Sequence, residues 1–405
     1  MKREIRKVVL AYSGGLDTSV IVRWLINKYG CEVIGYNANL GIAESRRDLD
    51  RRLKLAGGKR MVMEDIRREF LEDYCFPAMR AGAVYEGKYL LATALSRPLI
   101  AQKLIEIARR EKADAVAHGC TGKGNDQVRF EITTKALAPD VEVLAPVREW
   151  EFKTRDEEIA YAREYGIPVT ATKKNPYSYD RNLWGISIEC GPLEDPYREP
   201  PEGAFVITSS PAGAPAKSVV ITIGFSKGVP VSLNGRNMGP VDLVERLTAL
   251  GARHGIGRVD LVENRLVGIK SREVYEQPAS TILHAAYREL LSMVADRDTL
   301  HLMPALSDRY AQLVYDGFWF TPLRHALDAF FGKIAAGVTG EVRLRLLRGS
   351  CIPIGRRSPN ALYQEKLATY GAADVFDQSA SVGFIKILGL PVEVRARLRK
   401  GRPHA

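Results

Sequence analysis

The chain has 405 residues, of which 46% are hydrophobic and 26% are charged. This mixture is typical of a folded protein of two or three domains, and it excludes a disordered chain, a collagen-like fibre and a disulfide scaffold. No apolar run approaches the roughly 20 residues of a membrane span, and the run before Ser13 is too short for a signal peptide, so we predict a cytoplasmic protein that does not contact a membrane. The net charge of +11 suits nucleic acid, anionic small molecules or solubility equally.

Five cysteines are scattered along the chain, an odd number, without a C-x-x-C pair or a histidine at zinc-ligand spacing. This pattern predicts reduced thiols and neither a disulfide framework nor a structural metal site.

The first 165 residues alternate short apolar runs with helical patterns. We expect strands over 7–12, 32–36, 60–63 and 115–117 and helices over 17–29, 44–55, around 70–74 and around 99–107. Alternation of this kind predicts an α/β fold with a doubly wound parallel sheet, which binds its ligand at the carboxyl ends of the strands.

Beyond residue 165 several prolines interrupt the chain, and hairpin-like strands replace the alternation. We expect strands over 219–225, 230–233, 341–347 and 351–354 and helices over 241–250 and 280–294. The pattern predicts a nucleotide-binding domain over 1–165, an α+β domain over 166–359 and a C-terminal arm over 360–405. The arm ends in a basic run, which is usually only solvated.

The most informative segment joins the first strand to the first helix. It consists of Ala11, Tyr12, Ser13, Gly14, Gly15, Leu16, Asp17, Thr18 and Ser19. Glycines let the backbone approach a ligand, and a helix N-terminus offers N–H groups to phosphate oxygens. The hydroxyl groups add donors, and Asp17 is a candidate ligand for Mg²⁺. An ordinary glycine turn with an Asp/Thr cap is the alternative, although it leaves Ser-Gly-Gly unexplained.

Neither a Walker A loop nor a G-x-G-x-x-G fingerprint is present. The pattern S-G-G-x-D-[ST]-S instead resembles the pyrophosphate (PP) loop of N-type ATP pyrophosphatases, which cut ATP between its α and β phosphates and leave the substrate adenylated.

A second polar loop, from His118 to Glu131, follows the fourth strand and opens on the same sheet edge. It holds three glycines and several charged or hydrogen-bonding side chains, which suit a small polar ligand.

With these two motifs, the chain resembles the argininosuccinate synthase family over nearly its whole length. The resemblance also rests on segments spread through both halves: 80–87, 89–101, 175–178, 186–187, 193–196, 253–265, 270–276, 313–319 and 383–386. It implies condensation of citrulline with aspartate, driven by conversion of ATP to AMP and pyrophosphate with Mg²⁺. For the domain over 166–359 it implies substrate binding and multimerisation. It also implies a homotetramer whose C-terminal arm wraps a neighbour, and no nucleic-acid partner.

The resemblance also assigns roles to individual residues. The segment from Ala11 to Ser19 would hold ATP, with Ala38 and Gly119 against the adenosine, and Ser13, Asp17 and Asp126 would serve the chemistry. Thr121, Asn125 and Asp126 would bind aspartate, and Asn125 would also reach citrulline. The implied citrulline positions are Tyr89, Arg129, Ser178, Ser187, Glu263 and Tyr275, with Thr93 and Arg97 close by.

Each assignment has a purely structural alternative. Tyr89 would be a core residue, Ser178 and Ser187 would cap turns, Glu263 would pair with Arg265 or Arg258, and Arg129 would be a surface charge. Cys120, inside the second loop, is expected to be inert filling because the reaction needs no thiol.

Several positions depart from the family pattern. The usual Gly-Thr-Ser reads Ala92-Thr93-Ala94, which removes a hydroxyl expected at citrulline. Near the nucleotide a carboxylate and an amide are replaced by Asn39 and Ile42, and elsewhere Gly185 replaces a histidine and Glu273 a glycine. Three alternatives therefore stay open: another ureido substrate, an RNA-directed adenylating enzyme, and a non-catalytic paralogue.

Overall fold

The structure is a computed structural model that describes residues 4–42, 44–168 and 176–400. Asn175, part of one motif above, lies outside these residues. The chain divides into two compact units, Met1–Asn360 and Ala361–Ala405. In the described part of the chain, no helix combines the length and the apolar character that crossing a membrane requires.

Five parallel strands form the first sheet, in the order β3-β2-β1-β4-β5. The order runs outward from β1 in both directions, so the switch point lies between β1 and β4. Crevices for ligands form at the carboxyl ends of strands beside such a point. The strands are β1 (Lys7–Ala11), β2 (Glu32–Asn39), β3 (Arg60–Asp65), β4 (Ala115–Ala117) and β5 (Glu142–Leu144).

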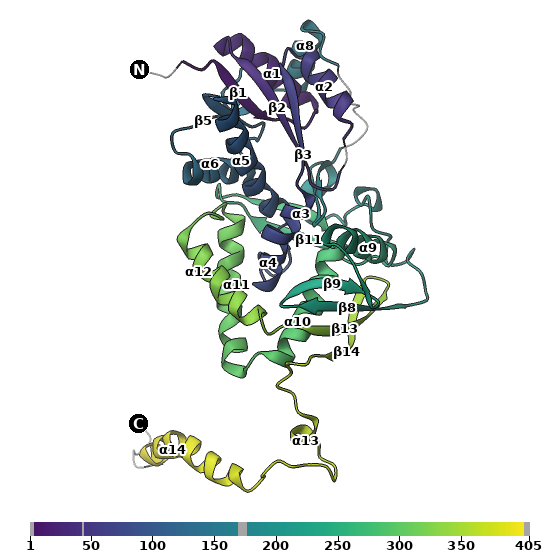
Figure 1. The fold of residues 1–405 in the computed structure, drawn as a ribbon, viewed down its shortest axis with the longest axis vertical. Coiled ribbons are helices and arrows are strands. Elements are labelled where there is room, and N and C mark those ends of the chain that lie inside the picture. The colour runs from purple at the N-terminus through teal and green to yellow at the C-terminus, as the bar shows by residue number, and fades with distance from the viewer. Residues whose placement is uncertain (1–3, 43, 169–175, 401–405) are drawn as a thin grey trace. The chain divides into compact units, whose positions relative to one another are not determined.

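Helices cover both faces of this sheet, with separate buried clusters on the two sides. On one side α1 (Leu16–Tyr29), α2 (Arg46–Leu55) and α8 (Arg155–Glu164) supply apolar residues. On the other side α5 (Ala92–Glu111) and α6 (Asp126–Leu137) do so. Figure 1 draws β1, β2 and β3 side by side with α1 and α2 close to them.

Local sequence explains where these helices begin and end. Gly30 adopts φ +65° at the C-cap of α1, a left-handed conformation that costs glycine little. Ser45 caps α2 by accepting from the N–H of Asp48, and Thr154 and Glu157 form a capping box at the start of α8. The short α7 (Pro146–Glu149) precedes α8.

A continuous helical stretch follows β3. It consists of α3 (Arg67–Glu69), a π-helical segment η1 (Phe70–Cys75) and α4 (Phe76–Arg80). The expected helix around 70–74 is therefore present, although its hydrogen bonds span five residues instead of four.

Two antiparallel sheets build the rest of the larger unit. One has the order β10-β9-β8-β13-β14 and the other the order β11-β12-β7-β6. Their strands are β6 (Ser178–Asn182), β7 (Gly185–Glu189), β8 (Val219–Ser226), β9 (Val229–Leu233), β10 (Arg236–Asn237), β11 (Arg258–Asn264), β12 (Lys270–Glu276), β13 (Gly340–Leu347) and β14 (Ser350–Arg357).

Helices pack on these sheets around the largest buried cluster. They are α9 (Pro240–Arg253), α10 (Pro278–Val294), α11 (Arg297–Tyr315) and α12 (Pro322–Ala335), with 3₁₀ turns η2 (Gly191–Glu194) and η3 (Glu202–Ala204). The helix α5 contacts β1 of the parallel sheet and also β6 and β7, so it joins the two halves of this unit.

Over residues 361–400, the described part of the second unit, the chain forms two helices, α13 (Glu365–Ala368) and α14 (Ala380–Lys400). Many apolar side chains of α14 are exposed, among them Phe384, Ile385, Ile387 and Leu388.

The predicted fold class is confirmed, and the expected strands and helices are present with ends shifted by a few residues. The largest difference is in α5, which runs from Ala92 to Glu111 where a helix around 99–107 was expected. The strand β2 runs to Asn39 instead of residue 36, and β14 runs to Arg357 instead of residue 354. Sequence reasoning identified neither β6 and β7 nor β11 and β12. These strands carry much of the candidate site.

Candidate active site

The loop after β1 turns sharply into α1. Gly14 adopts φ +75°, and a Cβ built there would lie 2.3 Å from Leu49 Cδ2, so only glycine fits. Gly15 is the N-cap of α1 and has no side chain to cover the free N–H groups. The Ser13 hydroxyl lies 3.2 Å from the Thr18 hydroxyl, and both are exposed to the space in front of the helix.

A pocket of about 1050 Å³ opens at this point. Its volume is at the upper end of the ~300–1,000 Å³ range of small-molecule sites, which leaves space for a nucleotide. Its walls come from the ends of β1 and β2, from the loop after β4 and from β6. Predicted site residues lining it are Ala11, Tyr12, Ser13, Gly15, Leu16, Asp17, Thr18, Ala38, Arg97, Gly119 and Ser178.

Side chains from neighbouring elements hold the β1 loop in place. The Asn37 amide donates to the Tyr12 carbonyl at 3.0 Å, and Arg52 donates to the Gly14 carbonyl at 3.1 Å. Asn39 accepts from the N–H of Gly41. Asn39, which replaces a carboxylate of the family pattern, thus stabilises nearby backbone through its amide oxygen, a role that needs no charge.

Asp17, in the first turn of α1, faces α8. Its carboxylate lies 3.6 Å from Arg155 and is half exposed. Burial and the nearby Asp17 raise the pKa of the Glu158 carboxyl to about 7. Two acidic side chains, Asp17 and Glu158, therefore lie together beside the first turn of α1, and Asp17 lines the pocket.

The second loop, after β4, is held by its own side chains. Gln127 donates to the carbonyls of Gly122 and Gly124. His118 Nδ1 accepts from the N–H of Cys120 at 3.3 Å. Burial raises the pKa of the Cys120 thiol to about 12, so the thiol is neutral at pH 7.

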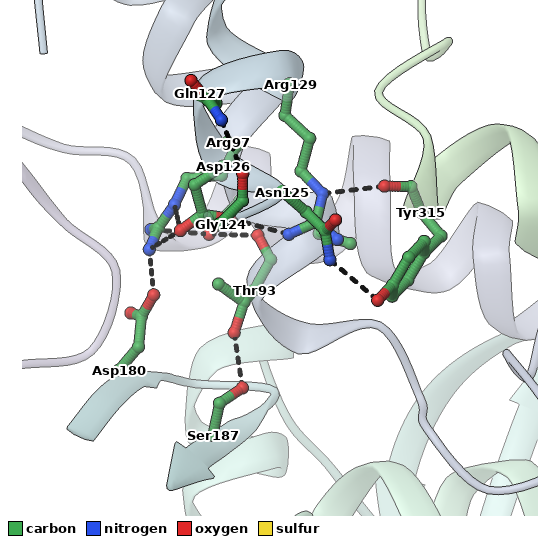
Figure 2. A network of polar contacts seen from close by, with 12 residues as sticks. Thr93, Arg97, Gly124, Asn125, Asp126, Gln127, Arg129, Asp180, Ser187 and Tyr315 are labelled. Carbon is green, nitrogen blue, oxygen red and sulfur yellow. Dashed lines mark hydrogen bonds and ion pairs between the residues drawn. The ribbon is translucent and has the colours of Figure 1, made fainter. Parts of the chain in front are cut away.

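Asp126, at the start of α6, lies between two arginines (Figure 2). Arg97 on α5 donates to Oδ2 at 2.9 Å, and Arg129 donates to Oδ1 at 2.7 Å. Arg97 also pairs with Asp180 on β6. Burial alone would raise the pKa of Asp126, but the two guanidinium groups outweigh it and hold the pKa below its ordinary value. Asp126 is therefore ionised, and both of its carboxylate oxygens accept hydrogen bonds from arginines of the same chain.

A buried cluster of tyrosines surrounds Glu263 on β11. Tyr275 donates to Glu263 Oε2 at 2.5 Å, and Tyr315 donates to Oε1 at 2.6 Å. The ring of Tyr89 stacks on that of Tyr275 with centroids 4.3 Å apart. Asn125 donates to the Tyr315 hydroxyl at 2.7 Å and accepts from the N–H of Leu266. This cluster joins the second loop to β11, β12 and α11.

Thr93 and Ser187 complete this region, with their hydroxyl oxygens 2.7 Å apart (Figure 2). Ser178 lies exposed at the start of β6 and lines the nucleotide pocket. Thr121 is exposed and accepts from the N–H of Gly124 through its carbonyl. Among the predicted substrate-binding residues, Ser178 and Thr121 are the two that are exposed.

Most of the structural alternatives for these residues are wrong. Arg129 is buried and donates to the Tyr315 carbonyl, so it is not a surface charge. Glu263 bonds to tyrosines, whereas Arg265 pairs with Glu189 and Glu273, and Arg258 pairs with Glu202. Ser187 lies within β7 and caps no turn.

The core alternative for Tyr89 is partly right. The ring of Tyr89 is buried in the main core, while its hydroxyl accepts from the N–H of Thr93 at 2.9 Å.

Sequence reasoning missed three residues of this site: Tyr315, Asp180 and Glu158. Tyr315 stands in a segment that resembles the family, yet no spacing rule connects it to Glu263, 52 positions earlier. Asp180 and Glu158 give no local signal, because only the folded chain brings them to Arg97 and Asp17.

Two departures from the family pattern have local explanations. Ala94 is fully buried in the main core. A Cβ at Gly185 would lie 3.0 Å from the Glu276 carbonyl oxygen and 3.4 Å from the Ala92 Cβ, so a larger residue there would have to displace its neighbours.

Comparison with known proteins matches nearly the whole chain. The model described as "Arginosuccinate synthase N-terminal HUP domain" matches residues 7–168, and the one described as "Arginosuccinate synthase C-terminal domain" matches residues 177–395. The argininosuccinate synthase of Aquifex aeolicus is 57% identical over 98% of this chain and 99% of its own. That of Pelotomaculum thermopropionicum is 52% identical over 97% and 98%.

A U34-tRNA thiolase from Methanococcus maripaludis shares 18% identity over 43% of this chain and 61% of its own, with a TM-score of 0.27, too low to bear on the fold. The two family models and the near-complete coverage of the relatives agree with the parallel sheet, its glycine loop and the antiparallel second half. The chain belongs to the argininosuccinate synthase family of ATP-using ligases.

Proposed function

We propose that this ligase joins citrulline to aspartate and forms argininosuccinate, AMP and pyrophosphate. The observation that carries the proposal is the connection between two sites. Arg97 lines the nucleotide pocket and pairs with Asp126, and Asp126 pairs with Arg129, which is bonded to Tyr315 beside Glu263. A nucleotide and an amino acid bound at the two ends of this chain of contacts would be neighbours.

The chemistry requires activation, because a ureido carbon is a poor electrophile. The ureido oxygen attacks the α-phosphorus of ATP and pyrophosphate leaves. The aspartate amine then attacks the adenylated carbon and AMP leaves with the bonding electrons. Fixed geometry and stabilised phosphate charge supply most of the catalysis in such a site.

The loop from Ala11 to Ser19 would hold the ATP phosphates. Ser13 and Thr18 offer hydroxyl donors, and the N-terminus of α1 offers N–H groups. Ala38 and Gly119, which line the same pocket, would pack on the adenosine. The carboxylate oxygens of Asp17 are ligands of the kind that Mg²⁺ prefers, and a bound Mg²⁺ would neutralise part of the phosphate charge.

Glu263 would receive the amino group of citrulline, since it is buried and ionisable and lies among donors that fix its orientation. Ser178, Ser187 and Tyr275 would contact the same substrate. Thr121, Asn125 and Asp126 would bind aspartate, with one guanidinium of the Arg97–Asp126–Arg129 group turning to the aspartate carboxylates.

Pyrophosphate release from ATP and Mg²⁺ tests the proposal, with aspartate or citrulline omitted in turn and the product identified by mass. Release that requires both amino acids and yields argininosuccinate supports it. Release with another ureido compound, but not citrulline, would show that the acceptor pocket has changed. Nucleotide binding without release would indicate a non-catalytic paralogue, and salt-sensitive tRNA binding in a filter assay would favour an RNA substrate.

We also propose that the enzyme is a cytoplasmic homotetramer. Each chain would have domain boundaries near residues 165 and 360. The exposed apolar side chains of α14 support this, because a helix so apolar is stabilised by a partner surface. Sedimentation of the full chain should give four times the monomer mass, and removal of residues 361–405 should lower it. A monomeric full chain would contradict this part of the proposal.

A further inference from the structure

Glu263 has a second carboxyl group beside it. Glu273 lies on β12, and β11 and β12 pair so that Leu261 is opposite Glu273. Because side chains alternate along strands, Glu263 and Glu273 share one face as diagonal neighbours, with Tyr275 next to them. Glu263 is the residue to which we assign the substrate amino group, so the charge of Glu273 bears directly on binding.

The number of hydrogen atoms shared by Glu263, Glu273 and Tyr275 indicates whether one of the two carboxyls is protonated. The Tyr275 hydroxyl oxygen lies 2.5 Å from Glu263 Oε2 and 3.0 Å from Glu273 Oε2, yet it carries one hydrogen. Two ionised carboxylates would leave one of these contacts as a repulsion between oxygen atoms. Both contacts are hydrogen bonds when Tyr275 donates to Glu263 and a protonated Glu273 donates to the Tyr275 oxygen.

The hydrogen-bond donors around the two carboxyls favour the proton on Glu273. Its two oxygens accept from Tyr275 and from Tyr315, the latter at 2.6 Å. The Tyr315 oxygen in turn accepts from Asn125. Charged acceptors make the stronger hydrogen bonds, so this arrangement favours a carboxylate at Glu263 and places the proton on Glu273.

The surrounding charges agree with that placement. Arg265 donates to Glu273 at 2.9 Å and also to Glu189 on β7 at 2.5 Å, so one guanidinium serves both carboxyls. Within the described part of the chain, Tyr275, Tyr89 and Cys190 also interact with Glu273, and burial raises the pKa of all three, so they are neutral at pH 7. Burial, with repulsion from Glu263 and Glu189, outweighs Arg265 and raises the pKa of Glu273 to about 8.

We propose that Glu273 is a positioning residue of the acceptor site that holds a proton beside Glu263 and releases it to solvent when the cationic amino group of citrulline binds. The proposal rests on the proposed function of Glu263. A substrate cation favours the ionised form of a nearby carboxyl, so binding and proton release are linked. The sign follows from this linkage. Affinity for citrulline rises as pH increases towards 8, because fewer protons must be displaced.

Calorimetric titration of the full-length enzyme with citrulline at pH 7, in buffers of different ionisation enthalpy, counts the released protons. We expect up to one proton per citrulline bound. The KM for citrulline should fall between pH 6 and 7.5, by up to about tenfold per pH unit, the limit for one linked proton. Absence of proton release from the wild-type enzyme would overturn the proposal without any variant.

Glu273→Gln isolates the residue. A glutamine amide donates to the Tyr275 oxygen as a protonated carboxyl does, but it does not titrate, so proton release and the pH slope of KM should disappear. Glu273→Asp should restore both. The matched control is Glu164→Gln on the exposed side of α8, which should keep both. Equal proton release from wild type and Glu273→Gln would show that a group other than Glu273 releases the proton. If the enzyme turns over citrulline but releases no proton on binding it, only the role proposed for Glu273 is overturned. If the enzyme does not bind citrulline, the proposed function is overturned as well.

Discussion

The hydroxyl oxygens of Thr93 on α5 and Ser187 on β7 lie 2.7 Å apart and are buried. This contact joins α5, the helix that packs on the parallel sheet, to the antiparallel sheet that carries Glu263 and Tyr275. The two residues are 94 positions apart, so the contact exists only in the folded protein.

A double-mutant cycle measures this contact. Thr93→Val keeps the shape of the side chain and removes the hydroxyl, and Ser187→Ala removes the partner. Each single variant should lose about 1 kcal/mol of unfolding free energy, because the remaining hydroxyl is left buried without its bond. The double variant should lose less than the sum, and urea denaturation gives the coupling. Strict additivity would show that the hydroxyls do not interact.

Asp126→Asn tests the pairing of Arg97 with Arg129. The variant should lose about 2 kcal/mol at pH 7, since hydrogen bonds to charged groups exceed neutral ones. The two arginines lower the pKa of Asp126. Its stabilisation is therefore present above the unfolded-state pKa near 4 and is lost as pH falls through the folded-state value. The difference from wild type in urea denaturation should shrink below pH 4.

The comparison for that experiment is Asp180→Asn, which affects Arg97 but not Arg129. It should cost less stability than Asp126→Asn, and it should raise the KM for aspartate less. If both variants lose the same unfolding free energy, the pairing of Asp126 with both arginines does not contribute more than the single pairing of Asp180.

Glu158→Gln should make the unliganded enzyme more stable at high pH. Burial and Asp17 raise the folded-state pKa of Glu158 to about 7. A carboxyl with a raised pKa favours the fold below its unfolded-state value near 4.3, and this contribution is lost as pH rises through 7. The Tm of the variant should therefore exceed that of wild type at pH 8.5 and approach it near pH 5. Glu164→Gln, exposed on the same helix, should show no such pH dependence.

Gly14→Ala should abolish ATP binding, whereas Gly30→Ala should not. Both glycines have similar positive φ values, +75° and +65°, so both alanines carry a backbone cost of about 1 kcal/mol. A Cβ at Gly14 meets Leu49 at 2.3 Å, but one at Gly30 meets nothing within 4 Å. Nucleotide titration and thermal unfolding separate the two effects, and equal ATP affinity in both variants would show that the loop tolerates the clash.

Much of the nucleotide side could be predicted because its signals are local. Strands of consecutive apolar residues, a glycine turn at Gly14 and a helix start at Leu16 lie next to one another in the chain. The acceptor side was less predictable, because β7, β11 and β12 are short strands of mixed polarity whose pairing is set by tertiary contacts. Their site residues came from family resemblance, and the protonation of Glu273 depends on side chains from three strands, which no sequence pattern reports.

Asn125 and Arg129, on the loop and helix after β4, both make their bonds to Tyr315 at the end of α11. The loop that would bind aspartate is thus supported by a residue 190 positions away. The nucleotide-binding half is therefore not an interchangeable module: transplanted onto a different second half, it would keep its sheet but lose the support that shapes its own loop. A change at Tyr315 would therefore reach both Glu263 and the loop after β4, because its side chain and backbone bond to residues of each.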